Sequence, residues 1–171
     1  IILIGVSAVP AHAATVFINE IHYDNAGSDI NEGVEILADA NTDLDGWSLQ
    51  FYNGGDGSLY KMTKLNGIVS DFGNGFGVLE FLIAGIQTGP ADGIALVNDL
   101  GELVEFISYE GVITGTEGPA LGINSVDIGI AEDDATTLNR SIQRVGVGDA
   151  ASLEASDFGW ITQQSSFGQF N

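Results

Sequence analysis

The 171-residue chain has no cysteine and only four basic residues, against 24 acidic ones. The lack of cysteine excludes a disulfide framework, a thiol nucleophile and a thiolate metal site. The formal net charge of -20 repels phosphate backbones and anionic lipids, so we expect no direct binding of nucleic acid. The same charge attracts divalent cations and basic partners, and it favours solubility at high ionic strength, where self-repulsion is screened.

Catalytic motifs are equally scarce. His12 lies in a segment that we interpret below as an export signal, so a Ser-His-Asp triad would have to use His22, and no G-x-S-x-G sequence accompanies it. A phosphate-binding G-x-x-x-x-G-K-[ST] loop is absent. The basic side chains available for a phosphate clamp are Lys61, Lys64, Arg140 and Arg144. We therefore predict that the chain is not an enzyme.

Apolar runs of transmembrane length are also missing. Residues 1–9, IILIGVSAV, form an apolar run that is too short to span a bilayer. Ala11 and Ala13 follow it and fit the A-x-A rule for signal peptidase, so we interpret residues 1–13 as the end of a secretory signal peptide. This predicts a secreted or cell-surface protein without a membrane span. The alternative is that the β-branched run is retained as an N-terminal assembly strand, which pairs with a neighbouring subunit.

What the sequence does contain indicates one all-β domain over residues 14–171. Its length and its hydrophobic content of 44% are sufficient for a core. Short apolar runs are separated by Gly, Asn and Asp, a pattern typical of a β-sandwich. The expected strands are residues 15–22, 33–37, 48–52, 77–83, 93–98, 104–108 and 141–144. Residues 98–102 predict a tight hairpin turn, and residues 126–130 show the apolar alternation of an edge strand.

Several segments follow one another in an order that resembles a known family. Residues 16–47, VFINEIHYDNAGSDINEGVEILADANTDLDGW, join two strand-like segments through an acidic loop. They are followed by GWSL and FYNG at 46–54, ADGIALV at 91–97, VEFISYEG at 104–111, SIQR at 141–144, ASDFGW at 155–160 and FGQFN at 167–171. Together these segments resemble the lamin-tail domain that bacteria export, which is often attached to secreted nucleases of the endonuclease/exonuclease/phosphatase type.

The resemblance implies an immunoglobulin-like antiparallel β-sandwich of the lamin-tail type, exported by a bacterium. It also implies an accessory module, because the phosphodiester chemistry of such nucleases belongs to the neighbouring domain. The core of the sandwich is expected to contain large apolar side chains. The candidates are Trp47, Phe51, Phe81, Leu96, Phe106 and Trp160.

The acidic loop after the first strand is the candidate metal site. Five oxygen-bearing side chains lie within nine residues, at Asp24, Asn25, Asp29, Asn31 and Glu32. Ca²⁺ takes six to eight oxygen ligands, so calcium is the predicted cofactor, although the spacing is not that of an EF-hand. The alternative is a solvent-exposed turn in which aspartates bond their own backbone amides. A second acidic group at residues 132–134 is interpreted as a solvated loop.

Three polar residues of the expected strands have structural interpretations. We expect His22 to end the first strand and to bond the acidic loop. Glu20 and Glu35 lie between apolar neighbours, and the two-residue period of a strand leaves no purely apolar face around Glu20. A half-buried carboxylate there needs hydrogen-bond donors or a cation, and it would anchor the adjacent loop.

Taken together, these features predict a non-catalytic, exported interaction or structural module at the cell surface or in the extracellular matrix, with protein partners. One alternative is a self-assembling subunit of a surface filament or layer, a homo-oligomer built by β-strand addition of residues 1–9. The other is an accessory domain cut from a secreted nuclease, which predicts a catalytic domain after residue 171.

Overall fold

The computed structural model describes residues 15–146 and 154–171, so the predictions for residues 1–13 lie outside the described residues. The described part contains ten strands and two 3₁₀ helices, Gly118–Ala120 and Ala155–Asp157. The strands are β1 (Val16–His22), β2 (Gly33–Asp39), β3 (Ser48–Tyr52), β4 (Leu59–Lys64), β5 (Phe76–Leu82), β6 (Gly93–Val97), β7 (Leu103–Ser108), β8 (Val126–Asp127), β9 (Arg140–Gly146) and β10 (Phe158–Gln164).

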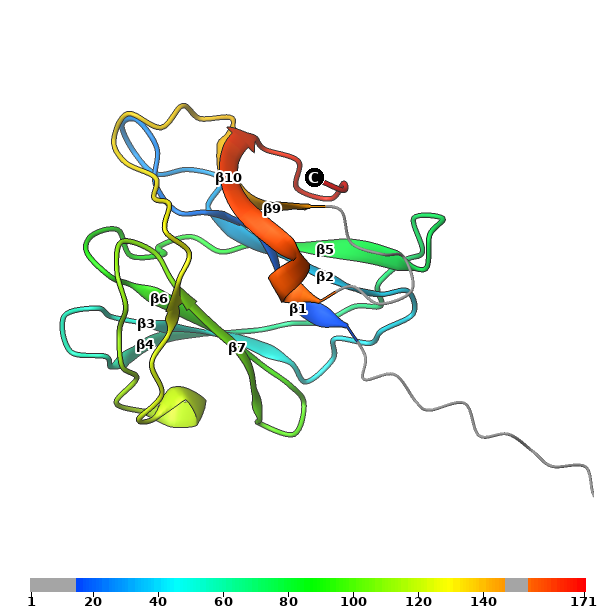
Figure 1. Ribbon diagram of the computed structural model, residues 1–171, viewed down its shortest axis with the longest axis horizontal. Helices are drawn as coiled ribbons and strands as arrows, with labels where there is room; N and C mark the ends of the chain where they lie inside the picture. Colours follow the sequence, from blue (N-terminus) through cyan, green and yellow to red (C-terminus); the bar gives the residue numbers. More distant parts are fainter. Residues whose placement is uncertain (1–14, 147–153) are drawn as a thin grey trace, which may run out of the picture.

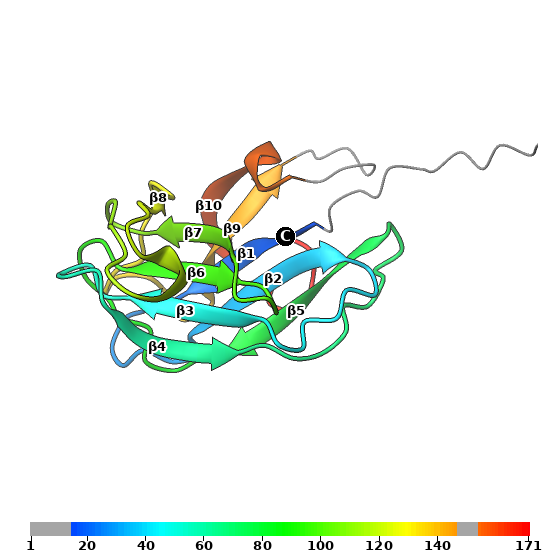
Figure 2. The ribbon, with the colours of Figure 1, turned by 90° about the horizontal axis from the view of Figure 1, so that it is seen from below.

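The strands form two five-stranded sheets packed face to face (Figure 1). One sheet has the order β10-β9-β1-β2-β5 and the other the order β4-β3-β6-β7-β8. Paired strands run antiparallel except for β7 and β8, which are parallel. Figure 2 shows the two layers from below. The predicted all-β sandwich is confirmed, and its immunoglobulin-like and lamin-tail details stay predictions.

The strands expected from the sequence are all present, with ends that differ by at most two residues. The expected edge strand at 126–130 shortens to β8, which spans two residues. Sequence reasoning gave no bounds for β4 and missed most of β10. Both are edge strands, whose exposed outer sides carry polar residues that weaken the apolar alternation.

The core lies between the sheets and is made of inward-facing apolar side chains from both. Phe51 and Leu96 are fully buried there, as predicted. Trp47, Phe81 and Trp160 are only partly buried and pack against this core. The remaining core candidate, Phe106, lies in a second buried cluster, which includes a residue of the first 3₁₀ helix. The buried members of this cluster are Tyr52, Ala95, Val97, Phe106, Ile113 and Ala120.

The hairpin between β6 and β7 is closed by Asn98, as the sequence predicts. Its backbone N–H donates to the carbonyl of Glu102 at 3.0 Å, and its Oδ1 accepts from the amides of Leu100 and Glu102 at 3.0 and 2.8 Å. Gly101 adopts a φ of 81°, a left-handed conformation that favours glycine. This turn helps to hold β6 and β7 in register. The long β7–β9 connection then crosses from one sheet to the other (Figure 1).

No helix within the described ranges is long and apolar enough to cross a membrane.

Candidate functional site

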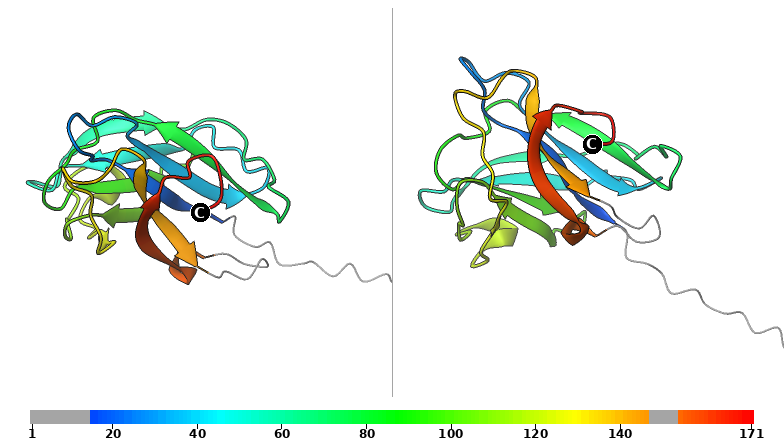
Figure 3. Two further views of the ribbon diagram at one scale, coloured as in Figure 1. Left: turned by 90° about the horizontal axis from the view of Figure 1, so that it is seen from above. Right: turned by 45° about the horizontal axis from the view of Figure 1, so that its top comes forward.

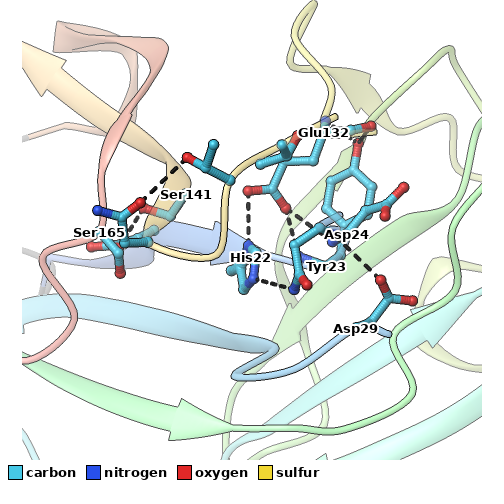
Figure 4. Close-up of polar contacts among 12 residues, drawn as sticks. His22, Tyr23, Asp24, Asp29, Glu132, Ser141 and Ser165 are labelled. Atoms are coloured by element: carbon cyan, nitrogen blue, oxygen red, sulfur yellow. Dashed lines mark hydrogen bonds and ion pairs between the residues drawn. The ribbon is translucent and has the colours of Figure 1, made fainter. Parts of the chain in front are cut away.

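The acidic loop between β1 and β2 meets the β7–β9 connection at Glu132 (Figure 4). The carboxylate of Glu132 accepts hydrogen bonds from His22 Nδ1 at 2.9 Å and from the backbone amides of Tyr23 and Asp24 at 2.7 and 3.1 Å. In return, the Glu132 amide donates to the Tyr23 hydroxyl at 2.8 Å. The Tyr23 ring stacks on Tyr109 at 3.9 Å between centroids. These contacts fix the end of β1 to a segment more than 100 residues away.

His22 links the acidic loop to the β7–β9 connection. Burial lowers its pKa, but the hydrogen bond and charge of Glu132 and the Ile30 carbonyl outweigh burial, so the pKa is raised overall. Its Nε2 lies 3.0 Å from Asn25 Nδ2 and 3.2 Å from the Ile30 carbonyl oxygen. The expectation that His22 bonds the acidic loop is therefore confirmed. Both ring nitrogens are occupied by protein groups, which makes His22 a fastening residue between the two loops.

Three of the five predicted calcium ligands do not converge on one point. Asn25 is buried, and its Nδ2 donates to the Ile30 carbonyl at 3.0 Å and lies 3.0 Å from His22 Nε2. Glu32 accepts from the amides of Gly85 and Ile86, both at 2.7 Å, and so ties the loop to the turn after β5. Asn31 is exposed, with a φ of 59° that shapes the turn. The Glu32 carboxylate is thus committed to holding the protein chain, whereas Asn25 is held through Nδ2 and its Oδ1 is buried without a hydrogen-bond partner among the described residues.

The other two predicted ligands, Asp24 and Asp29, lie close together near the surface. Burial and the charges of Asp29 and Asp134 raise the pKa of Asp24 to about 6. The loops are joined there by a 2.8 Å hydrogen bond from the Ala26 amide to the Thr136 carbonyl. Sequence reasoning placed Asp134 in a separate solvated loop, and no spacing in the sequence indicates that it approaches Asp24. The result is a concentration of negative charge that a proton or a cation would relieve.

This charge concentration does not form a closed metal cage. Within residues 15–146 and 154–171, no group of three or more His, Cys, Asp or Glu side chains is arranged to hold a metal ion. Ca²⁺ also accepts main-chain carbonyl and water oxygens, so two or three carboxylates are sufficient for a weak site if the loop supplies the rest. The calcium prediction stays a prediction.

A second polar cluster lies on the outer face of the first sheet. Glu20, Glu35 and Glu80 face one another across β1, β2 and β5, because Glu20 pairs with Glu35 and Glu35 with Glu80 in the strand register. We call these three residues the carboxylate row. Glu20 and Glu35 have no exposed surface, whereas Glu80 is exposed. Like charges directly opposite each other on neighbouring strands are destabilising, so this row needs compensation.

The compensation comes from residues 165–171, which we call the C-terminal strap. Glu20 accepts from the hydroxyls of Ser141, Ser165 and Ser166 at 2.6 to 2.9 Å and from the Ser166 amide at 3.0 Å. Figure 4 labels two of these donor residues, Ser141 and Ser165. Glu35 accepts from Asn19 Nδ2 at 2.8 Å and from the strap amide of residue 168 at 2.6 Å. The expected hydrogen-bond donors are present, but the expectation that the carboxylate anchors the adjacent loop is wrong, because the segment that Glu20 and Glu35 hold is the C-terminal strap.

A groove of about 490 Å³ lies between the β7–β8 edge of one sheet and the β9–β10 edge of the other. Val104 and Val126 line it and are 43% and 68% exposed, and Trp160 forms part of its wall. Arg144 and Glu105 form an ion pair in the lining, and the Arg144 guanidinium lies 4.6 Å from the Trp160 ring centroid. Exposed apolar side chains are thus gathered beside one buried ion pair.

Comparisons with protein-family models, with curated proteins and with solved structures find no match. The resemblance to lamin-tail domains therefore stays an expectation that rests on the sequence segments alone.

Proposed function

We propose that the chain is a non-catalytic, exported interaction module that binds an apolar segment of a basic protein partner in the groove between the two sheets. The observation that carries the proposal is the groove itself, where Val104 and Val126 expose apolar surface next to Trp160. Contiguous exposed apolar surface in a soluble protein is typical of an interaction site. The net charge of -20 favours a basic partner, because complementary charge accelerates association and suppresses wrong partners.

The test compares two variants that add the same charge at exposed valines. Val126→Glu places a carboxylate in the groove, whereas Val112→Glu does so at a position that is 59% exposed and outside it. Wild-type protein and Val112→Glu are expected to retain the same basic protein from the cell-surface fraction of the source cells, and Val126→Glu is expected to lose it. Equal retention by all three proteins contradicts the groove as the docking site.

The non-catalytic part of the proposal is tested with the purified chain and DNA in the presence of Mg²⁺ or Ca²⁺. We expect no hydrolysis. Hydrolysis that disappears in a His22→Ala variant contradicts the proposal, because it assigns a catalytic role to the residue that fastens the two loops.

The export part of the proposal is tested by the mature N-terminus of the native protein. A start at Ala14 supports a cleaved signal, whereas a start at Ile1 favours self-assembly through residues 1–9.

Calcium binding at the acidic loop is the second candidate function. The observation that favours it is the approach of Asp29 and Asp134 to Asp24, which gathers carboxylates from two distant segments at the surface. A ligand at a hundredfold excess over its Kd stabilises the folded state by about 2.7 kcal/mol. For a chain of this length we expect the Tm to rise by about 5–10 °C in Ca²⁺ relative to EDTA.

The calcium test needs controls for charge and ionic strength. Asp24→Asn is expected to abolish the shift, whereas Asp71→Asn, in an exposed turn elsewhere, leaves it intact. Mg²⁺ at the same ionic strength measures general screening. A shift that is equal for both cations, or that survives in Asp24→Asn, shows that the loop is only an Asx-rich turn.

A further inference from the structure

The C-terminal strap covers the outer face of the first sheet, where it folds back over strands β1 and β2 (Figure 3). Most of its recorded contacts with the sheet are polar. Besides the bonds to Glu20 and Glu35, Asn171 Nδ2 donates to the carbonyls of Asn19 and Arg144 at 3.2 and 2.9 Å. The aromatic contact is made by Phe170, which meets Phe72 edge-on at 5.1 Å. Both rings are more than a third exposed, so this aromatic contact buries little apolar surface, and the other strap aromatic, Phe167, is only partly buried.

The strap also forms part of the wall of a partly open hollow. Phe170 and Asn171 form part of the lining of a cavity of about 210 Å³, together with Leu37 on β2 and Phe158 on β10. Removal of the strap would therefore expose the carboxylate row and take away part of the wall of this hollow.

The carboxylate row lacks a cation. Glu35 faces Glu20 on β1 and Glu80 on β5, and its uncharged partners are Asn19 and the strap amide of Gly168. Gln143 is the residue that pairs with Glu20 on β9, and residues 165–171 carry no ionisable side chain. The ion pairs found among the described residues, His22–Glu132 and Arg144–Glu105, lie outside the row. With no counter-charge, a proton on one carboxyl is the remaining means of neutralisation.

We propose that the C-terminal strap is a proton-controlled cover: it lies closed over the carboxylate row while Glu35 holds a proton, and it opens when that proton passes to water. Opening leaves a solvated carboxylate on Glu35 and uncovers the outer face of the sheet together with the hollow under Phe170. The inference does not rest on the groove or on its partner.

The direction of the coupling follows from linkage. Burial, followed by the charges of Glu20 and Glu80, raises the pKa of Glu35 to about 8, although its bonds to Asn19 and Gly168 act in the opposite direction. In the open form the carboxyl is exposed, so its pKa returns towards the ordinary glutamate value of about 4.3. Between these two values the closed form binds one more proton than the open form. The opening constant therefore rises about tenfold per pH unit, and by several hundredfold between about pH 5 and about pH 9.

Hydrogen exchange of the full chain measures this opening. The amides of Ser166 and Gly168 donate to the two buried carboxyls, so they exchange only when the strap opens. After correction for the intrinsic exchange rate, we expect their opening constants to rise with pH in the wild type and to be independent of pH in Glu35→Gln. Glu80→Gln is the matched control, because it removes the exposed charge of the row and keeps the buried proton site. Equal pH dependence in the wild type and Glu35→Gln overturns the proposal.

A second measurement keeps the test decisive if Glu35→Gln does not fold. Gly168→Pro removes the strap amide and is incompatible with the observed φ of 79°, so it detaches the strap without changing the row. Gly122→Pro is the control, at an exposed glycine with a φ of 75°. In a carboxyl NMR titration, the pKa of Glu35 is expected near 8 in the wild type and in Gly122→Pro, and to fall in Gly168→Pro. The same titration in all three proteins shows that the strap does not control the proton, and the proposal fails.

Discussion

Replacement of Glu132 by Gln is expected to remove the strongest link between the β1–β2 loop and the β7–β9 connection. The Glu132 carboxylate is nearly fully buried and accepts from His22 Nδ1 and from the amides of Tyr23 and Asp24. Glutamine has almost the same shape but has only one acceptor oxygen, and its NH₂ group would face donors. The substitution therefore tests the charge and the acceptor pattern with little change in packing.

The expected cost follows from these three contacts. A hydrogen bond to a charged group contributes about 1.5–3 kcal/mol, and breaking a buried ion pair costs about 3–5 kcal/mol. Because Gln keeps one of the acceptors, we expect the free energy of unfolding to fall by about 3 kcal/mol near pH 6. For a chain of this length, that loss lowers the Tm by about 6–12 °C.

The cost depends on pH with a definite sign. Burial lowers the pKa of His22, but Glu132 and the Ile30 carbonyl raise it by more than burial lowers it. The pKa of His22 therefore lies above its ordinary value of 6.5. The stability contributed by the His22–Glu132 pair is fully present below the unfolded-state pKa and is lost as the pH rises through the folded-state pKa. Glu132→Gln is therefore expected to cost more at about pH 5.5 than at about pH 9. The part due to the two backbone amides remains at both values.

Urea denaturation of the wild type and the variant at these two pH values measures the difference. Asp133→Asn is the matched control, because it removes one negative charge from the neighbouring exposed residue and keeps the oxygen that accepts from the Ala135 amide. A loss below about 1 kcal/mol at the lower pH, or an equal loss at both, refutes the argument that a charged pair holds the loops together. A comparable loss in Asp133→Asn would assign the effect to net charge.

Three further substitutions are expected to change stability, each measured by urea denaturation. Gly54→Ala places a Cβ 2.6 Å from the carbonyl oxygens of Pro90 and Ala91, and overpacking of this kind costs about 1–3 kcal/mol; no loss would show that the two turns separate easily. Ala91→Gly relieves a φ of 71° and is expected to gain about 0.5–1 kcal/mol; destabilisation would contradict backbone strain there. Arg144→Met leaves the carboxylate of Glu105 without its ion-pair partner and is expected to cost about 3–5 kcal/mol, and a neutral result would show that the pair only offsets its own desolvation.

The sequence was sufficient for the fold class because its turns and apolar alternations are local signals. Strand β3, residues 48–52, is bounded as predicted, and the Asn98 turn closes as its residue type indicates. Local signals fail at the sheet edges. Strand β10, FGWITQQ, buries Trp160 only partly and pairs on one side with β9, so its pattern is set by contacts that no short window contains.

Only part of the candidate site could be predicted, because local signals reveal neighbours in the chain and not tertiary contacts. The sequence placed Asp24 and Asp29 in one loop and His22 beside it, because all three are neighbours in the chain. It did not indicate that Glu132 and Asp134 complete the arrangement, since they lie more than 100 residues away. It also counted Glu32 as a ligand, whereas the fold directs that carboxylate to the amides of Gly85 and Ile86. Spacing reports which oxygens are near one another in sequence, but tertiary contacts decide where each one points.

The distant carboxylate contacts explain how a cysteine-free, strongly acidic chain fastens its segments. In each of six glutamates, a carboxyl group accepts from a backbone amide at least 53 residues away. These residues are Glu20, Glu32, Glu35, Glu105, Glu117 and Glu132. Hydrogen bonds from distant amides to these carboxyl groups satisfy buried donors and give each segment one position, and they are charge-assisted where the carboxyl is ionised. Disulfides fill this role in many exported domains. The acidic composition that excludes nucleic acid as a ligand thus also supplies the cross-links, and buried glutamates of this kind contribute to the fold while the exposed aspartates remain available for cations.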